Sequence, residues 1–199
     1  MFNSAKYWED RYSRGKTSGS GSYGRLAQYK ADFLNKLIED NQISSILDLG
    51  CGDGNQLTLL RDVTYVGVDV SDTVLSTIRA RFADRPNCTF VHMNDLAQVD
   101  RLDLAMSNDV IYHLVEDEVF ERYMRSLFGH ARRYVVVYSS NHDKSAHSSH
   151  VRHRKFTDFV SKEISDWVLV QSEPNPYPWD PANSSETSFA SFHVFKSLK

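Results

Sequence analysis

Three closely spaced glycines constrain the fold of this chain more than any other feature. Gly50, Gly52 and Gly54 directly follow an apolar run at 46–49 and precede a stretch with helical character. Glycine lets the backbone turn tightly and come close to a ligand, as in the first strand–turn–helix unit of nucleotide-binding α/β folds. A tight connection that binds nothing would have the same glycines, so the surrounding pattern has to decide between the two.

Short apolar runs alternate with helical stretches along most of the chain. We expect buried parallel strands at 46–49, 65–68, 89–92, 102–106 and 134–138. Helices are expected up to about 41 and near 56–61, 73–82, 116–128 and 151–160, with Ser71 and Asp72 at the start of the third. This alternation predicts βαβ units with right-handed crossovers.

The last part of the chain departs from this alternation. The runs at 167–171 and 189–195 are joined by a proline-rich loop with no helix between them, which indicates an antiparallel hairpin at the sheet edge. The sequence therefore predicts an α/β, Rossmann-like, doubly wound, seven-stranded and mostly parallel sheet with an antiparallel C-terminal hairpin.

Length and charge limit the function classes. A chain of 199 residues is long enough for one compact core and short for two, so we expect one domain over 1–199. A net charge of −3 gives no global attraction for nucleic acid. Cys51 and Cys88 form no disulfide or zinc pattern, and no apolar run is long enough to cross a membrane. We expect a cytoplasmic protein, a monomer or weak dimer, with neither nucleic acid nor membrane as partner.

Two acids near the glycines separate the possible cofactors. Asp69 ends the next predicted strand, where a carboxylate can accept both hydroxyls of a ribose. Gly54 comes one residue too early for the dinucleotide pattern, and Asp53 inside the turn would repel a pyrophosphate. A cationic sulfonium ligand tolerates that acid, so the turn favours S-adenosylmethionine.

Over nearly its full length the chain resembles the class I S-adenosylmethionine-dependent methyltransferases, including small bacterial enzymes of polysaccharide and natural-product pathways. The resemblance rests on ILDLGCGDG, FVHMNDLAQ and LAMSNDVIYHL. It implies that the glycines line the methionine part of the cofactor, that Asp69 binds the ribose and that Asp95 contacts the adenine. It also makes 25–199 a cofactor-binding core and 1–24 a lid or loop segment, with S-adenosyl-L-homocysteine as product. The expected cofactor contacts are Asp48, Gly50, Cys51, Gly52, Asn55, Gln56, Asp69, Val70, Asn94, Asp95, Leu96, Ser107 and Asn108.

Plainer roles stay open for several of these residues. Asp95 also fits an exposed loop acid, and Asp109, at the end of the fourth-strand motif, also fits a helix cap. Cys51 fits a small packing residue in the turn better than a reactive thiol.

The acceptor side is expected on loops at the carboxyl ends of the strands. Tyr112 and His113 follow the fourth strand, and the loop after the fifth adds further basic groups: His142, His147, His150, Arg152, His153 and Arg154. We expect Tyr112, His113 and His153 to act in catalysis, and Arg152 and Arg154 to hold an anionic group. A metal site is a competing interpretation, but no tight ligand spacing supports it and we predict none. A solvated polar loop is the third interpretation.

The N-terminal segment offers one more wall for the acceptor. Tyr7, Trp8 and Arg11 share one face of a predicted helix, which suits a lid that binds substrate or ordinary packing on the core. The proline-rich loop at 175–181 is a further candidate wall.

The function expected from these features is O-methylation of a small or peptide-like acceptor, possibly an anionic carboxylate or phosphate, in a biosynthetic pathway. Two alternatives stay open. One is N-methylation of a small amine, which Tyr7, Trp8 and Asp109 allow. The other is a cofactor-binding regulatory protein without transferase activity.

Overall fold

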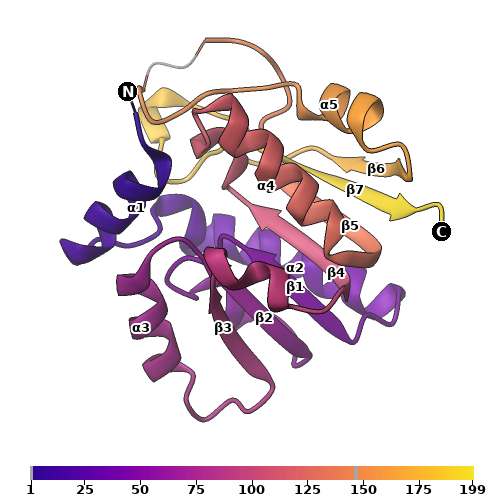
Figure 1. The fold of residues 1–199 in the computed structure, drawn as a ribbon. Helices are drawn as coiled ribbons and strands as arrows, with labels where there is room; N and C mark the ends of the chain where they lie inside the picture. The colour runs from indigo at the N-terminus through magenta and orange to yellow at the C-terminus, as the bar shows by residue number, and fades with distance from the viewer. Residues whose placement is uncertain (1, 146–147) are drawn as a thin grey trace.

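A computed structural model of the chain describes residues 2–145 and 148–199, and within them seven strands form a single sheet (Figure 1). The strand order is β3-β2-β1-β4-β5-β7-β6, and all neighbours are parallel except β7, which is antiparallel to both β5 and β6. The predicted doubly wound sheet and its antiparallel C-terminal hairpin are confirmed. The strands are β1 Ser45–Leu49, β2 Thr64–Asp69, β3 Cys88–His92, β4 Leu102–Asn108, β5 Ala131–Ser139, β6 Trp167–Glu173 and β7 Ser191–Ser197.

Helices cover both faces of this sheet. They are α1 Ser4–Ser13, α2 Gly24–Asp40, α3 Asp72–Arg81, α4 Asp117–Gly129 and α5 Phe156–Glu163, with short 3-10 turns η1 Ser20–Ser22, η2 Gln56–Leu59, η3 Met93–Gln98, η4 Ile111–His113 and η5 Pro181–Asn183. The predicted start of α3 is confirmed, because the Ser71 side chain accepts a hydrogen bond from the backbone N–H of Val74.

Two of the predicted helices differ from the structure. The stretch at 56–61 is only the turn η2, because Leu60 is already extended and the chain enters β2 at Thr64. The helix expected at 151–160 begins at Phe156. The preceding residues are instead held against η4, where the backbone N–H of Arg152 donates to the Tyr112 carbonyl at 2.7 Å.

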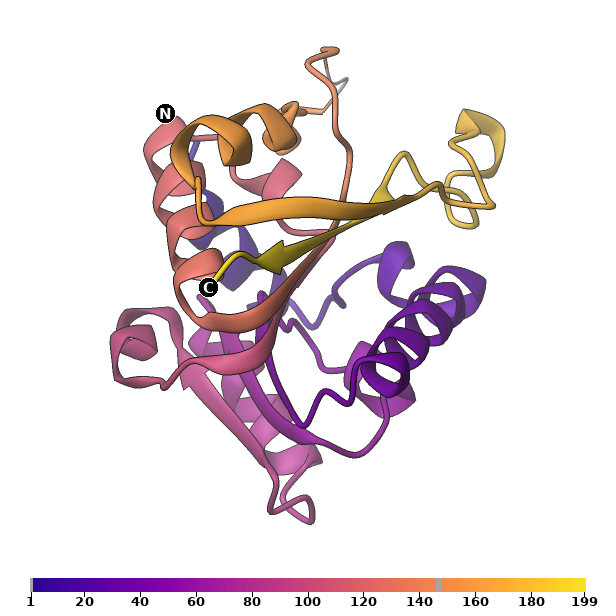
Figure 2. The ribbon, with the colours of Figure 1, turned by 90° about the vertical axis from the view of Figure 1, so that its right-hand side faces the viewer.

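Apolar side chains from the two helix layers form two cores separated by the sheet. Leu34 of α2 and Ile78 of α3 pack against Ile46, on the face that α2 and α3 cover. On the opposite face Met124 of α4 and Phe156 of α5 pack in the second core. Figure 2 shows α2 on one side of the sheet and α4 and α5 on the other. Among the described helices, none combines the length and apolar character needed to cross a membrane.

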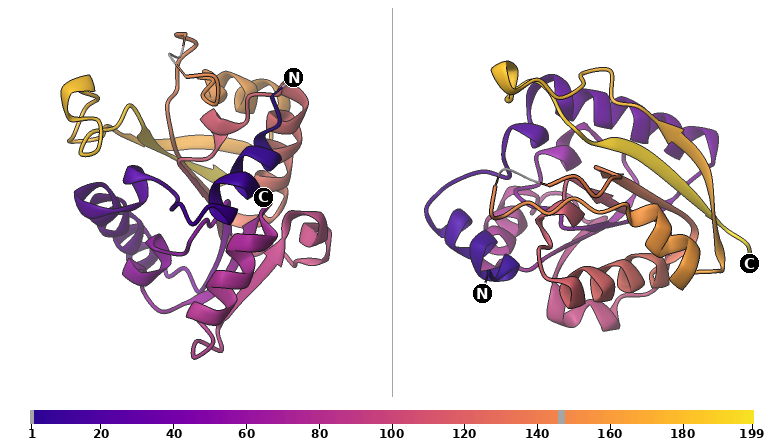
Figure 3. Two further views of the ribbon diagram at one scale, coloured as in Figure 1. Left: turned by 90° about the vertical axis from the view of Figure 1, so that its left-hand side faces the viewer. Right: turned by 90° about the horizontal axis from the view of Figure 1, so that it is seen from above.

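Helix α1 contacts the starts of α3 and α4 at the carboxyl ends of the strands (Figure 3). Its Ser4 backbone N–H donates to Glu116 Oε1, before α4, at 2.9 Å, and its hydroxyl donates to the His113 carbonyl at 2.9 Å. At the other end the Glu9 carboxylate accepts hydrogen bonds from Thr73, in the first turn of α3. These contacts fix α1 over the sheet end where open α/β folds bind ligands.

Candidate active site

A cavity of about 790 Å³ lies at the carboxyl ends of β1, β2 and β4, beneath α1. Its size is within the range of small-molecule and cofactor sites. The N-terminal helix contributes Ser4, Ala5, Trp8 and Tyr12 to its wall, and the glycine turn and strand ends contribute the floor. The residues predicted to contact a cofactor that line this cavity are Asp48, Gly50, Cys51, Gly52, Gln56, Asp69, Val70, Asn94, Leu96 and Asn108.

Close packing explains why the turn needs glycine. Gly50 has a φ of 87°, and a Cβ atom there would come within 2.5 Å of the Val110 side chain. Gly52 has a φ of 55°, and a Cβ atom there would overlap the Ser18 hydroxyl. Asp53, inside the turn, uses its Oδ2 to accept from the Ser18 backbone N–H at 2.7 Å and the Tyr23 hydroxyl at 2.9 Å. The turn is thereby tied to the segment that joins α1 to α2.

Asp69 stands at the end of β2 with both carboxylate oxygens engaged by backbone. Its Oδ2 accepts from the Gly52 N–H at 3.0 Å, and its Oδ1 from the Ser71 N–H at 3.1 Å. Burial raises the pKa of Asp69 to about 6. A carboxylate with spare lone pairs at the cavity wall is suited to accept hydrogen bonds from a ribose.

Unpartnered polar atoms identify the part of the cavity that is built for a charged ligand. Within the described residues, Asp48 Oδ1, Gln56 Oε1 and both amide atoms of Asn108 are buried without a hydrogen-bond partner, and all three side chains line the cavity. Burial also raises the pKa of Asp48 to about 6. Buried polar groups normally have partners, so this set indicates a ligand with donors and an acceptor. The ammonium and carboxylate of the methionine part of S-adenosylmethionine fit it.

Three residues predicted to contact the cofactor lie outside the cavity lining. The Asp95 side chain is exposed after β3, although its neighbours Asn94 and Leu96 line the wall. Ser107 is fully buried, and its Oγ is 2.7 Å from the Tyr123 hydroxyl, which donates to it. The Asn55 amide donates to the Ser22 carbonyl at 2.7 Å. Ser107 and Asn55 hold the surrounding structure, and none of the three side chains lines the cavity.

At the end of β4 the cavity wall carries an ion pair that we did not predict from the sequence. Lys30 Nζ lies 2.6 Å from Asp109 Oδ2, and the Tyr112 hydroxyl donates to Asp109 Oδ1 at 2.9 Å. Lys30 and Asp109 both line the cavity, and the Lys30 side chain is only 1% exposed. A signal existed in the sequence, because Lys30 lies midway between Leu26 and Leu34 at helical spacing, on the buried face of α2.

The residues expected in catalysis lie behind the wall of the cavity. His113 is half-buried between the rings of Trp8, at 5.0 Å, and His150, at 5.5 Å, and desolvation of its ring lowers its pKa to about 4. Its ring is therefore neutral near pH 7. His153 Nδ1 is 2.7 Å from the Ser140 hydroxyl. Tyr112 reaches the cavity wall through its bond to Asp109, and His113 through its ring contact with Trp8.

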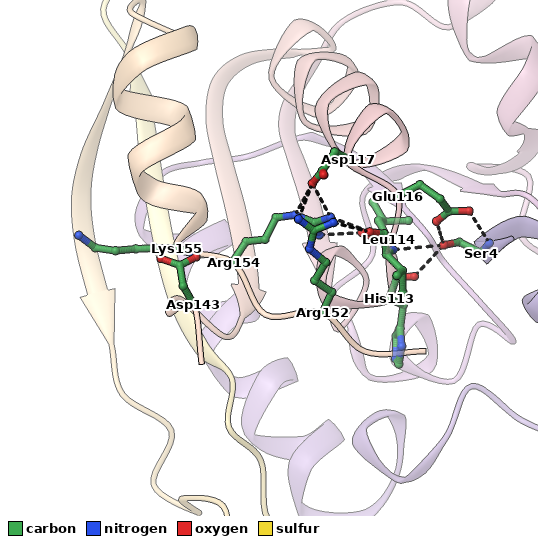
Figure 4. Close-up of polar contacts among 10 residues, drawn as sticks. Ser4, His113, Leu114, Glu116, Asp117, Asp143, Arg152, Arg154 and Lys155 are labelled. Atoms are coloured by element: carbon green, nitrogen blue, oxygen red, sulfur yellow. Dashed lines mark hydrogen bonds and ion pairs between the residues drawn. The ribbon is translucent and has the colours of Figure 1, made fainter. Parts of the chain in front are cut away.

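The two arginines expected to hold an anion are engaged within the protein (Figure 4). Arg154 donates to the Leu114 carbonyl at 2.7 Å and the Val115 carbonyl at 2.9 Å, and pairs with Asp117 at 3.1 Å. Arg152 donates to the same Val115 carbonyl and pairs with Asp117 at 2.9 Å. Both side chains fasten the segment before α4, and neither lines the cavity, so the geometry gives no support to an anion-holding role. His147, from the same loop, lies outside the described residues.

Of the three N-terminal residues expected to contact the acceptor, one lines the cavity and two are engaged elsewhere in the protein. Trp8 lines the cavity. Tyr7 instead stacks on the ring of His150 at 5.0 Å, and Arg11 Nε donates to the Thr17 carbonyl at 2.7 Å. In the part of the chain that the structure describes, no three His, Cys, Asp or Glu side chains are grouped to hold a metal ion.

Comparisons with known proteins agree with this fold. Residues 46–133 match the family model described as a methyltransferase domain. No curated protein sequence matches the chain. Among solved structures, the N-methyltransferase NodS from Bradyrhizobium japonicum WM9, in complex with S-adenosyl-l-homocysteine, is similar with a TM-score of 0.74 and 13% identity over 100% of both chains.

Two further structures share the fold. The magnesium protoporphyrin IX methyltransferase from Synechocystis PCC 6803 with bound SAH has a TM-score of 0.69 and 16% identity over 97% of each chain. The CcbJ methyltransferase from Streptomyces caelestis has a TM-score of 0.69 and 14% identity over 100% of both chains. The methyltransferase-domain match over residues 46–133, the strand order and the cavity agree with a class I S-adenosylmethionine-dependent methyltransferase. S-adenosylmethionine is the cofactor that fits this site.

Proposed function

We propose that this methyltransferase acts on a hydroxyl oxygen of a small acceptor, and that Asp109 receives the hydroxyl proton. The observation that carries the proposal is the Asp109 carboxylate in the cavity wall at the end of β4, beside Asn108 and Gly50. A carboxylate at this place can accept a hydrogen bond from the acceptor and then its proton.

The bound cofactor supplies an electrophilic methyl group on a cationic sulfur. The protein positions the reactants and excludes water, which is most of what an in-line displacement requires. Asp69 is suited to the ribose, and Asp48, Gln56 and Asn108 to the methionine part, while Trp8 of α1 covers the cavity. When bound, the cofactor would give its methyl group to the acceptor oxygen and leave as the neutral thioether. The acceptor proton passes to the Asp109 carboxylate.

The ion pairs around Asp109 and the start of α4 support a neutral acceptor group beside Asp109 rather than a carboxylate or phosphate. The ammonium of Lys30 is already paired with Asp109, and Arg152 and Arg154 are paired with Asp117. An anionic acceptor would therefore meet Asp109 without a free cation from these groups to hold it.

A small amine is the second candidate acceptor. Besides the acids assigned to the cofactor, the cavity wall holds Asp109 and Glu116, together with the aromatic rings of Trp8 and Tyr12. Acids and aromatic faces both attract an ammonium group, so an amine could bind here before it loses a proton.

The test is methyl transfer from isotope-labelled cofactor to a panel of hydroxyl, amine, carboxylate and phosphate acceptors, with the methylated atom identified by mass spectrometry. We expect hydroxyl products, and loss of their formation in Asp109→Asn. Asp84→Asn, which changes an exposed acid after α3, is the matched control and should keep full activity. Methylation of an amine alone would favour the second candidate. A protein that binds the cofactor and methylates none of the panel would support the regulatory alternative.

A further inference from the structure

Helix α2 carries two lysine–aspartate pairs that differ sharply in their surroundings. Lys30 and Asp109 are 2.6 Å apart with side chains 1% and 13% exposed. Lys36 and Asp40 are 2.8 Å apart with side chains 77% and 53% exposed. Exposed pairs contribute little to folding, whereas a buried ammonium is costly unless a well-placed anion compensates it. The first pair therefore needs an explanation that the second does not.

Stability alone does not supply that explanation. Replacing a buried ion pair by apolar side chains of similar size is often neutral or stabilising. Here the neighbours of Lys30 on the same helix face, Leu26 and Leu34, are buried in the core, while Lys30 itself reaches the cavity wall. Its ammonium pairs there with Asp109, so its effect falls on that carboxylate.

Asp109 is held from several sides. Its backbone is left-handed, with a φ of 59°, a conformation that is uncommon outside glycine and that aspartate tolerates better than most residues. Lys30 of α2 holds Oδ2 and Tyr112 of η4 holds Oδ1. Gly21 of η1 packs so closely that a Cβ atom there would lie 3.1 Å from Oδ2. The carboxylate therefore has one orientation, which presents it to the cavity.

We propose that Lys30 is a positioning residue for methyl transfer: through its ion pair it fixes the Asp109 carboxylate in the orientation that meets the acceptor. This inference rests on the proposed role of Asp109. Lys30 itself does not take the acceptor proton. The Lys30 ammonium keeps the Asp109 side chain from rotating away from the cavity. It also compensates the negative charge of that carboxylate.

A double-mutant cycle separates this role from a merely structural one. The variants are Lys30→Met, Asp109→Asn and the double variant, with Lys36→Met as the matched control on the same helix. Each is measured for acceptor kcat and KM, for S-adenosylhomocysteine affinity by calorimetry and for thermal unfolding. Lys30→Arg, which retains the positive charge, is included as the conservative variant.

We expect kcat to fall about 100-fold, the scale of a lost acid–base contribution, in both single variants and to the same level in the double variant. The Tm should behave differently: each single variant leaves one buried charge without its partner and unfolds earlier, while the double variant recovers. Lys30→Arg should regain part of kcat, S-adenosylhomocysteine affinity should stay constant, and Lys36→Met should resemble the wild type.

Three results would overturn the inference. One is a double variant whose kcat recovers together with its Tm, because Lys30 would then act only on folding. Another is normal kcat in Lys30→Met while Asp109→Asn is inactive. The third is weaker S-adenosylhomocysteine binding in Lys30→Met, which would assign Lys30 to the cofactor. Full activity in Asp109→Asn would instead refute the proposed function itself. Should Lys30→Met not fold, the double variant and Lys30→Arg still decide the question.

Discussion

Replacing Asp48 by asparagine should make the cofactor-free protein more stable near neutral pH, although Asp48 lies in the cofactor site. Asp48 is 3% exposed, and its Oδ2 accepts a hydrogen bond from the Tyr65 hydroxyl at 2.7 Å. Its Oδ1 has no partner among the described residues. An asparagine keeps an oxygen for Tyr65 and removes a buried charge whose burial cost the Lys30 cation offsets only in part.

The size of the effect follows from the pKa of Asp48, which burial raises from 3.8 to about 6. A carboxyl group with a higher pKa in the folded state binds its proton more tightly there than in the unfolded chain. Stability is therefore lost as the pH rises from 3.8 to about 6, and the loss persists above that window. At about 1.4 kcal/mol for each pH unit, the loss is about 3 kcal/mol, to order of magnitude. Asp48→Asn should recover much of it.

The assay is urea unfolding of the cofactor-free wild type and Asp48→Asn at about pH 8 and about pH 4.5. The variant should be more stable at the higher pH, with most of the difference gone at the lower one, and the exposed substitution Asp84→Asn should show neither change. S-adenosylhomocysteine affinity should fall in Asp48→Asn, because the ligand ammonium loses a charged acceptor. A variant less stable than the wild type at about pH 8 would refute the reasoning.

Three further substitutions test the rest of the site. Asp69→Ala should weaken S-adenosylhomocysteine binding by about 1–3 kcal/mol in calorimetry with the fold intact, and unchanged affinity would mean that the ribose is held elsewhere. Gly52→Ala places a Cβ atom on the Ser18 hydroxyl at a φ of 55°, so we expect cofactor binding to be lost, and normal turnover would contradict the packing argument. Arg154→Gln should lower the Tm, because the Leu114 and Val115 carbonyls lose their donor, while acceptor KM stays near wild type. A large rise in KM with an unchanged Tm would restore the anion-holding interpretation.

Features encoded over short stretches of the chain could be predicted from the sequence. The strands are continuous apolar runs because both faces of the sheet are buried, and the missing helix before the last strand leaves an antiparallel hairpin as the simplest outcome. The glycine turn and Asp69 are close in sequence and need only the first βαβ unit to meet, so the cofactor could be inferred before the fold was known.

Contacts between distant segments could not be predicted in this way. Lys30 and Asp109 are 79 residues apart, and helical spacing assigns Lys30 to the buried face of α2 without naming the anion that receives it. For Arg152 and Arg154, the sequence showed donors near the expected active edge. The fold brings the segment 114–117 close to both arginines. Their guanidinium groups bind the backbone carbonyls of this segment and the Asp117 carboxylate, so they are not available to a ligand.

The sequence by itself determined the sheet, the alternation of strands and helices along the chain, and the class of cofactor. Apolar periodicity and a glycine turn are local properties of the chain, so both can be recognised without the fold. The tertiary structure alone decided which polar side chains face the cavity. A side chain with several possible partners binds the one that packing brings closest, and that choice depends on how α1, α2 and the loop before α5 come together at the end of the sheet.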